Sequence, residues 1–256
     1  HPEDLVFVTN ATSGVNAVLQ SYPPPAGSEV LTSNHRYDAV GNTLRRSVEA
    51  SGARLVEAQV PFPLSEPADI LHAFAEAITA DTFMMVIDQI TSPTALLFPV
   101  AELIALARSH GVLVLIDGAH APGQVDLDLN ALQPDWWVGN LHKWVCAPKG
   151  AAVLWSARAH HARMRSTVTS HGFGDGYHAE FDWPGTFDPT AILASVKAMD
   201  MHDELGGAQF RAQNHQLAAE AREMLCSELK LVFVGFLSLR RHGFRGNASG
   251  SVLCWP

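Results

Sequence analysis

The chain has 256 residues, of which 47% are hydrophobic and 17% charged, and its formal net charge is −9. This length suffices for one large domain, or for one domain and part of another, and the apolar share excludes global disorder. The negative charge argues against a nucleic-acid binder or a protein that binds anionic membranes, while leaving room for a local basic pocket that holds a phosphate.

Cysteine usage and the chain start bear on the compartment. The three cysteines, at positions 146, 226 and 254, form neither a disulfide framework nor a zinc-binding spacing, which favours the cytoplasm. No apolar run reaches the ~18 residues that a transmembrane helix needs. The chain begins with His1-Pro2 rather than with an initiator methionine or a signal peptide, so we expect that its front end is trimmed.

Short apolar segments alternate with segments whose apolar residues recur every three or four positions. The apolar segments predict seven strands: Leu5–Val8, Glu29–Thr32, Arg54–Val60, Phe83–Ile87, Val112–Ile116, Asp135–Gly139 and Ala151–Trp155. The periodic segments predict four helices: Thr12–Gln20, Asp38–Glu49, Pro67–Ile78 and Val100–Ser109. This alternation predicts an α/β fold with a mostly parallel sheet, helices on both faces and ligands at the carboxyl ends of the strands. The unbroken run Val112–Ile116 predicts a central strand buried on both faces.

The character of the chain changes after Trp155. Residues 156–188 are rich in His and Gly and predict long loops. The stretch from Pro189 to about Leu229 predicts two helices separated at Gly206-Gly207, because glycine commonly ends a helix. Residues 230–256 lack the earlier alternation, and we interpret them as an atypical tail outside any natural domain, such as a truncation or a shifted reading frame produces.

An acid and a lysine predict a particular chemistry. Asp117 follows the run Val112–Ile116, so its carboxylate is expected at the carboxyl edge of the sheet, although an Asp-Gly pair also caps turns. Lys143 lies in an apolar stretch, where burial lowers the pKa of an amine, unless it is an exposed lysine. Lys149, the rival lysine, is typical of a turn. Pyridoxal phosphate needs such a pair: the amine forms a Schiff base with its aldehyde, and the carboxylate keeps its pyridine nitrogen protonated.

Other polar residues follow the predicted strands. Thr9–Gly14 leads into the first helix and either binds a phosphate through its backbone N–H groups or is an ordinary N-cap. His35 or Tyr37, after the second strand, offers a flat ring that can cover a cofactor. Ser92, after the fourth strand, offers a hydroxyl near the cofactor's phenolic oxygen, unless its segment is simply a proline-containing turn.

Five segments resemble the class V aminotransferase superfamily, and in particular its isopenicillin N epimerase-like branch: Asp117–Gly123, Gly139–Trp144, Cys146–Gly150, His171–Phe173 and Glu180–Thr186. The resemblance covers roughly residues 3–229. It implies the fold of the PLP-dependent transferases, fold type I, with the cofactor-binding large domain in residues 1–188, helices leading toward a small domain in 189–229, and most of that small domain missing.

The resemblance also implies residue roles. Lys143 would carry the cofactor as an internal aldimine, Asp117 would pair with the pyridine nitrogen, and His120 would contact the phenolic oxygen. The phosphate-binding and ring-stacking residues would be Ala11, Thr12, Ser13, Asn140, His142 and His35. Thr186 would contact the phosphate in the neighbouring subunit, which implies a homodimer.

The chain departs from the branch in several respects. Phe187 stands where an arginine is common. We also expect the chain to lack the small C-terminal domain that usually supplies the arginine for the substrate carboxylate. Neither Cys226 nor Cys254 has the setting of the mobile nucleophilic cysteine of desulfurases, so we do not assign that activity. Cys146 is expected to be a small packing residue.

The favoured hypothesis is an enzyme that acts on an amino acid. Lys143 removes the α proton, and Asp117 keeps the cofactor ring in its electron-accepting form. Epimerase, aminotransferase and lyase outcomes remain open at this point. The alternative is a catalytically silent fragment or pseudo-enzyme that retains the cofactor-binding scaffold. A nicotinamide-binding Rossmann protein is disfavoured because no G-x-G-x-x-G follows the first strand.

Overall fold

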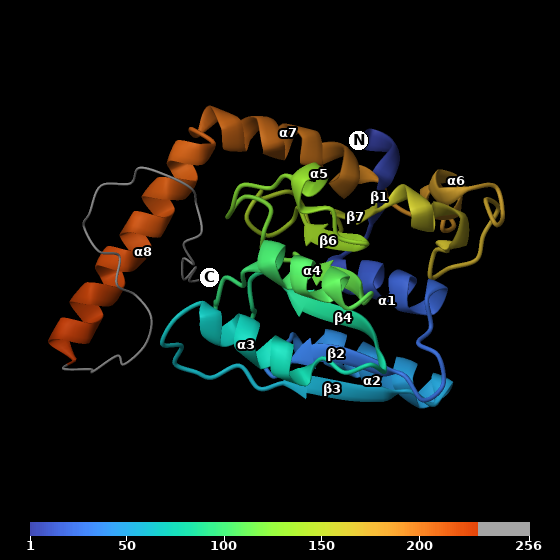
Figure 1. The fold of residues 1–256 in the computed structure, drawn as a ribbon. Coiled ribbons are helices and arrows are strands. Elements are labelled where there is room, and N and C mark those ends of the chain that lie inside the picture. Colours follow the sequence, from blue (N-terminus) through green and yellow to red (C-terminus); the bar gives the residue numbers. More distant parts are fainter. Residues whose placement is uncertain (230–256) are drawn as a thin grey trace.

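A seven-stranded sheet forms the centre of the molecule (Figure 1). The computed structural model describes residues 1–229, and the strand order is β1-β7-β6-β5-β4-β2-β3. The strands are β1 (Leu5–Val8), β2 (Glu29–Ser33), β3 (Arg54–Ala58), β4 (Thr82–Asp88), β5 (Leu113–Asp117), β6 (Trp136–Asn140) and β7 (Ala152–Ser156). β7 pairs antiparallel with both β1 and β6, whereas the four pairs formed by β2 to β6 are parallel, so the predicted mostly parallel sheet is confirmed. Each predicted strand forms, with ends within two residues of the expected positions.

Helices cover both faces of the sheet, as predicted (Figure 1). They are α1 (Ala11–Ser21), α2 (Asp38–Ser51), α3 (Ala68–Ala77), α4 (Val100–Ser109), α5 (Leu129–Leu132), α6 (Tyr177–Asp182), α7 (Thr190–Glu204) and α8 (Ala208–Glu228), with the 3₁₀ helices η1 (Pro2–Asp4) and η2 (Arg158–Arg163). α1 packs with α2, and α3 packs with α4. The first four helices begin and end within two residues of the predicted bounds.

The central strand β5 connects two hydrophobic cores. Leu115 packs into the core formed with α1 and α2, and Ile116 packs into the core formed with α3 and α4. Both side chains are fully buried. They enter different cores because successive residues of a strand point to opposite faces of the sheet. The predicted burial on both faces is confirmed. The strand then ends at Asp117, which brings a carboxylate to the edge of the sheet.

The segment 156–188, expected to form long loops, contains the short helices η2 and α6, and α5 was also not expected. The loop prediction is therefore wrong at η2 and α6. All three helices have four to six residues, which is too short for a periodic pattern. Glu180 holds the second half of this segment together. Its side chain is 2% exposed, pairs with Arg165 at 3.1 Å and accepts a hydrogen bond from the Gly174 N–H at 2.7 Å.

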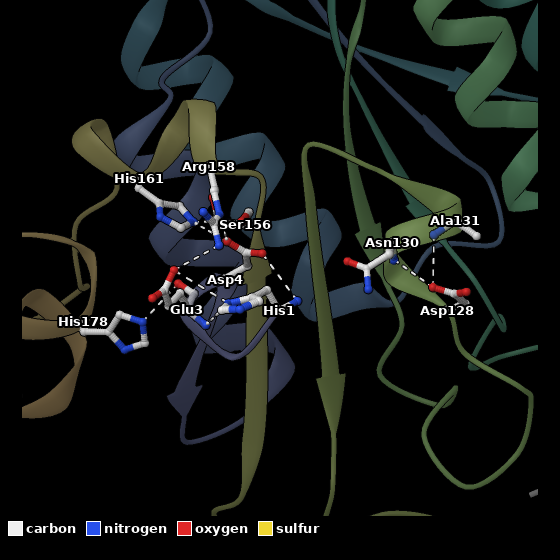
Figure 2. A network of polar contacts seen from close by, with 10 residues as sticks. All are labelled: His1, Glu3, Asp4, Asp128, Asn130, Ala131, Ser156, Arg158, His161 and His178. Carbon is white, nitrogen blue, oxygen red and sulfur yellow. Dashed lines mark hydrogen bonds and ion pairs between the residues drawn. The ribbon is translucent and has the colours of Figure 1, made fainter.

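A polar network joins η1 to the chain that follows β7 (Figure 2). Arg158 donates to the carboxylates of Asp4 and Glu3, each at 3.0 Å. His178 of α6 lies 3.0 Å from the Glu3 carbonyl oxygen. Because Asp4 is buried, its charge requires such partners. The network fixes the start of β1 against η2 and α6.

α7 and α8 are separated at Gly206-Gly207, as the sequence predicts. Both glycines have positive φ, 113° and 52°, a backbone region that favours glycine. No residue of α8 is buried, and the helix extends away from the sheet (Figure 1). The domain division at 188/189 stays a prediction, and the predicted tail 230–256 lies outside the described residues.

We expect Ile116→Ala to lower the free energy of unfolding by about 2–5 kcal/mol, because it opens a cavity in a fully packed core. Leu217→Ala is the control, since Leu217 is 66% exposed on α8. Its effect should stay within about 0.5 kcal/mol. Urea unfolding followed by circular dichroism measures both variants, and equal effects would contradict the burial described for β5.

Candidate active site

A cavity of about 500 Å³ opens at the carboxyl ends of β4, β5 and β6, beside the start of α1. Its volume is within the range of small-molecule sites. Most of the residues predicted from the sequence line it: Ala11, Thr12, Ser13, Ser92, Asp117, His120, Asn140, His142 and Lys143. These residues come from distant parts of the chain, and the parallel sheet brings them together because it gathers strand ends at one edge.

Asp117 provides a buried carboxylate in this cavity. Its side chain is 3% exposed and accepts a hydrogen bond from the Ala119 N–H at 3.0 Å. Burial raises the pKa of Asp117, and the hydrogen bond from Ala119 and then the charge of a protonated Lys143 oppose this rise. The next residue is a glycine, and a Cβ at Gly118 would lie 2.4 Å from the Trp137 ring, which leaves no room for a side chain. The missing side chain lets the backbone pass the ring and turn the carboxylate toward the cavity.

Lys143, His120 and Trp144 form a chain of short contacts. The Lys143 Nζ lies 2.9 Å from His120 Nε2, and the Trp144 indole N–H donates to His120 Nδ1 at 3.2 Å. Burial lowers the pKa of Lys143, against the attraction of Asp117 and Asp88. Burial, with the charge of Lys143, also lowers the pKa of His120 to about 4. The lysine therefore has the reduced basicity that a nucleophilic amine needs.

Asp88 is a site residue that the sequence reasoning missed. It ends β4, stands in register with Asp117 and is 3% exposed. One carboxylate oxygen accepts from the Tyr37 N–H at 3.2 Å, and the other has no hydrogen-bond partner among the described residues. Burial, followed by repulsion from Asp117, raises the pKa of Asp88 well above its ordinary value. An apolar run ending in an acid, as at Asp117, was the signal that could have identified it.

The start of α1 faces the cavity and is held in place by two asparagines. Asn10 is the N-cap, and its side-chain oxygen accepts from the Ser13 N–H at 2.8 Å. Asn140, at the end of β6, accepts from the Ala11 N–H at 2.9 Å. Backbone N–H groups and the helix dipole make such a terminus attractive to an anion.

Two predicted residues lie elsewhere. His35 is 6% exposed and bonded to the Thr94 hydroxyl at 2.9 Å and to the Val60 carbonyl at 3.0 Å, whereas Tyr37 lines the cavity. Of the two rings left open by the sequence, the structure therefore brings Tyr37 to the cavity wall. Thr186 is exposed in the loop after α6, and its predicted contact with a neighbouring subunit stays a prediction.

The lysine and cysteine expectations have mixed outcomes. Lys149 is exposed in a turn before β7, as predicted. Cys146 is exposed with a positive φ of 62°, so the expectation of a packing residue is wrong. Cys226 is half-buried on α8, and Cys254 lies outside the described residues.

Within residues 1–229, no helix is long and apolar enough to span a membrane, and no group of three or more His, Cys, Asp or Glu is arranged to hold a metal ion.

The chain belongs to the class V aminotransferase family, since the family model described as Aminotransferase class-V matches residues 1–242. It is 32% identical over 240 residues to the isopenicillin N epimerase of Streptomyces clavuligerus, an alignment that covers 88% of this chain and 60% of that protein. It is also 32% identical over 240 residues to the putative L-cysteine desulfhydrase 1 of Oryza sativa subsp. japonica, covering 87% and 50%. The predicted resemblance is confirmed, and the chain spans 50–60% of the length of these two relatives.

Solved structures have the same fold. An apo cysteine desulfurase from Thermococcus onnurineus NA1 matches with a TM-score of 0.79 at 18% identity, covering 94% of this chain and 62% of that one. The cystine C-S lyase C-DES, in complex with cysteine persulfide, matches with a TM-score of 0.76 at 19% identity, covering 91% and 64%. The predicted fold type I architecture is confirmed.

The pKa of His120 predicts a pH dependence of stability. The folded chain keeps this imidazole neutral down to pH about 4, whereas the unfolded chain takes up the proton near the ordinary value of 6.5. Stability contributed by the neutral ring is therefore lost as the pH falls through this window. His120→Gln should reduce that loss. Urea unfolding at both ends of the window measures it, with His110→Gln, at the exposed end of α4, as the control. An unchanged loss in His120→Gln would contradict the assignment.

Proposed function

We propose that this chain forms the large domain of a pyridoxal 5'-phosphate-dependent enzyme that acts on an amino acid in the cytoplasm, with Lys143 as the residue that attaches the cofactor. The observation that carries the proposal is the convergence of a lysine amine of lowered pKa, a buried carboxylate and a helix N-terminus on one cavity. Membership of the class V family supports it, and one structure of C-DES is described with glycine covalently linked to its PLP cofactor.

The cavity residues fit this cofactor. The start of α1, with Ala11, Thr12 and Ser13, offers backbone N–H groups and the positive end of the helix dipole to a phosphate. Asn140 and His142 border the same region. In this proposal both complete the phosphate site, and Asn140 also keeps the end of β6 joined to the helix start.

The remaining lining residues suit the aromatic ring of the cofactor. Asp117 pairs with the ring nitrogen, because a buried carboxylate favours a protonated partner. Ser92 and His120 contact the phenolic oxygen, and Tyr37, which is 43% exposed and lines the cavity, takes the ring-covering role first considered for His35. When bound, pyridoxal phosphate supplies an aldehyde that condenses with amines and a protonated ring that accepts electrons.

The neighbouring acids divide their charge. Two carboxylates in register at the end of adjacent buried strands cannot both ionise without a large desolvation and repulsion cost. Burial and then repulsion from Asp117 raise the pKa of Asp88, which favours the protonated form of this carboxyl. Asp117 keeps the negative charge, because the hydrogen bond from the Ala119 N–H lowers its pKa against the effect of burial.

Lys143 is the proton-transfer group. Its lowered pKa favours the neutral amine, which is the form that can take a proton from the α carbon of the bound amino acid, and His120 lies 2.9 Å away to orient it. The proposal covers epimerase, aminotransferase and lyase outcomes, which differ in the atom that regains a proton or loses a substituent. The epimerase and desulfhydrase relatives include two of these outcomes.

We expect the wild-type chain mixed with pyridoxal phosphate to acquire visible absorbance and, after borohydride reduction, a label on Lys143. Lys143→Ala should lose both signals because the attaching amine is gone. Lys149→Ala, on an exposed turn six residues away, is the matched control and should keep both. Absorbance and peptide mass spectrometry provide the readout. A label on Lys149, or an undiminished signal in Lys143→Ala, would refute the assignment, and a label without turnover of any amino acid would favour a silent scaffold.

We also propose that the active unit is a homodimer in which Thr186 reaches the phosphate of the neighbouring site. Thr186 is exposed, and the large apolar side chains beside it, Trp183 and Phe187, are 51% and 40% exposed. An interface formed by a second copy would cover them and bring the hydroxyl to the other cavity.

Co-expression of two defective chains tests this sharing. Thr186→Glu should weaken cofactor binding because it places a negative charge near the phosphate, and Lys143→Ala abolishes attachment. In a mixed dimer, one site combines an intact Lys143 with an intact Thr186 from the other chain, so absorbance should return. If each Thr186 serves its own chain, both sites of the mixed dimer are defective and no absorbance returns, which would reject the shared site.

A further inference from the structure

We propose that Trp144 is a positioning residue that fixes His120 in the tautomer with its proton on Nε2 and thereby keeps the Lys143 amine neutral. A neutral Lys143 amine matters for cofactor attachment only if the proposed function holds. The tautomer of His120 does not depend on that function. The three side chains form a linear series: the indole nitrogen lies 3.2 Å from His120 Nδ1, and His120 Nε2 lies 2.9 Å from Lys143 Nζ.

The tautomer follows from the chemistry of the indole. A tryptophan N–H can only donate, so a hydrogen bond from Trp144 requires a lone pair on His120 Nδ1. This requirement excludes both the Nδ1–H tautomer and the doubly protonated imidazolium. The remaining state of the ring is the neutral imidazole with its proton on Nε2. A histidine tautomer is usually ambiguous in a structure, and here the partner resolves it.

The protonation state of Lys143 follows from the next contact. An ammonium group has three donors and no acceptor, so it cannot hydrogen-bond to an Nε2–H. A contact of 2.9 Å between Nε2 and Nζ therefore needs an amine with a free lone pair. Burial lowers the pKa values of both Lys143 and His120, which is the direction that this pair of neutral groups requires.

The charged groups near the Lys143 amine raise its pKa, against the effect of His120. Asp117 and Asp88, at the ends of β5 and β4, favour the protonated lysine. His142, on the same loop as Lys143, also lines the cavity and bonds the Ala151 carbonyl at 2.8 Å. The Nε2–H of His120 offsets the attraction of the carboxylates by offering the amine only a donor.

The backbone holds the indole in this position. A Cβ at Gly123 would lie 2.6 Å from the carbonyl carbon and oxygen of Trp144, and φ of Gly123 is 82°. The loop that follows β5 and the loop that carries Lys143 are thus packed backbone to backbone. This contact sets the distance between Trp144 and His120, which both project from these loops.

Trp144→Phe removes the donor and keeps an aromatic ring. His120 can then carry its proton on Nδ1 and accept a hydrogen bond from a protonated Lys143, so the ammonium form gains a partner. We expect the pH profile for capture of pyridoxal phosphate to move upward by about one unit, which means about tenfold slower capture at neutral pH. Trp155→Phe is the matched control, since Trp155 is buried in the core and its indole N–H has no hydrogen-bond partner among the described residues.

Two measurements test the proposal. The first is ¹⁵N NMR of the histidine side chains in the full chain without cofactor, with the His120 signals assigned by their loss in His120→Gln. Wild type and Trp155→Phe should show the Nε2–H tautomer at neutral pH, and Trp144→Phe should show Nδ1–H or exchange between the two. The second is the rate of visible absorbance gain on addition of pyridoxal phosphate, recorded as a function of pH.

The outcomes are distinct. An Nδ1–H or charged His120 in wild type, or an Nε2–H form that persists in Trp144→Phe, overturns the tautomer assignment. A changed tautomer with an unshifted capture profile overturns the link to Lys143. If wild type captures no cofactor at any pH, the proposed function fails, while the NMR result still decides the tautomer.

Discussion

The amine of Lys143 and the carboxylates of Asp88 and Asp117 share one partly dehydrated edge of the sheet, and the rest of the site depends on how their charges are reconciled. Taking such groups out of water is costly unless each is paired, hydrogen-bonded or neutralised. Here Asp88 is driven toward its protonated form and Asp117 takes a backbone N–H. The lysine is driven toward its neutral form. Both pKa shifts reduce the number of charged groups at this edge.

The sheet makes this arrangement compact. β4 and β5 run parallel in register, so Asp88 and Asp117 end the two strands side by side. β6 follows on the other side and ends at Asn140, which bonds the first residue of α1. The N-terminus of α1 and a carboxylate pair thus line the same cavity. One offers backbone N–H groups and the other offers negative charge, so the cavity combines two opposite kinds of polar group.

The sequence predicted the parts of this picture that depend on local pattern. Strands and long helices have their own periodicity, and the lysine and aspartate motifs lie directly after apolar strands. Residues such as Tyr37 and Asp88 depend instead on strand register and loop conformation, which no single segment encodes. The same holds for Cys146, whose exposure follows from a left-handed turn. Short helices such as α6 were not predicted because contacts between residues distant in sequence hold them, such as the ion pair between Arg165 and Glu180.

The antiparallel β7 has a consequence for motion. Because β6 and β7 are adjacent, the connection that carries Lys143 starts and ends in the same sheet. It is also cross-linked internally, since the N–H groups of Leu141 and His142 both donate to the Ala151 carbonyl. A backbone tethered at both ends has little freedom to swing, so any displacement of the amine falls to torsions of the lysine side chain. Such rotations take picoseconds to nanoseconds, whereas loop displacements take nanoseconds to microseconds.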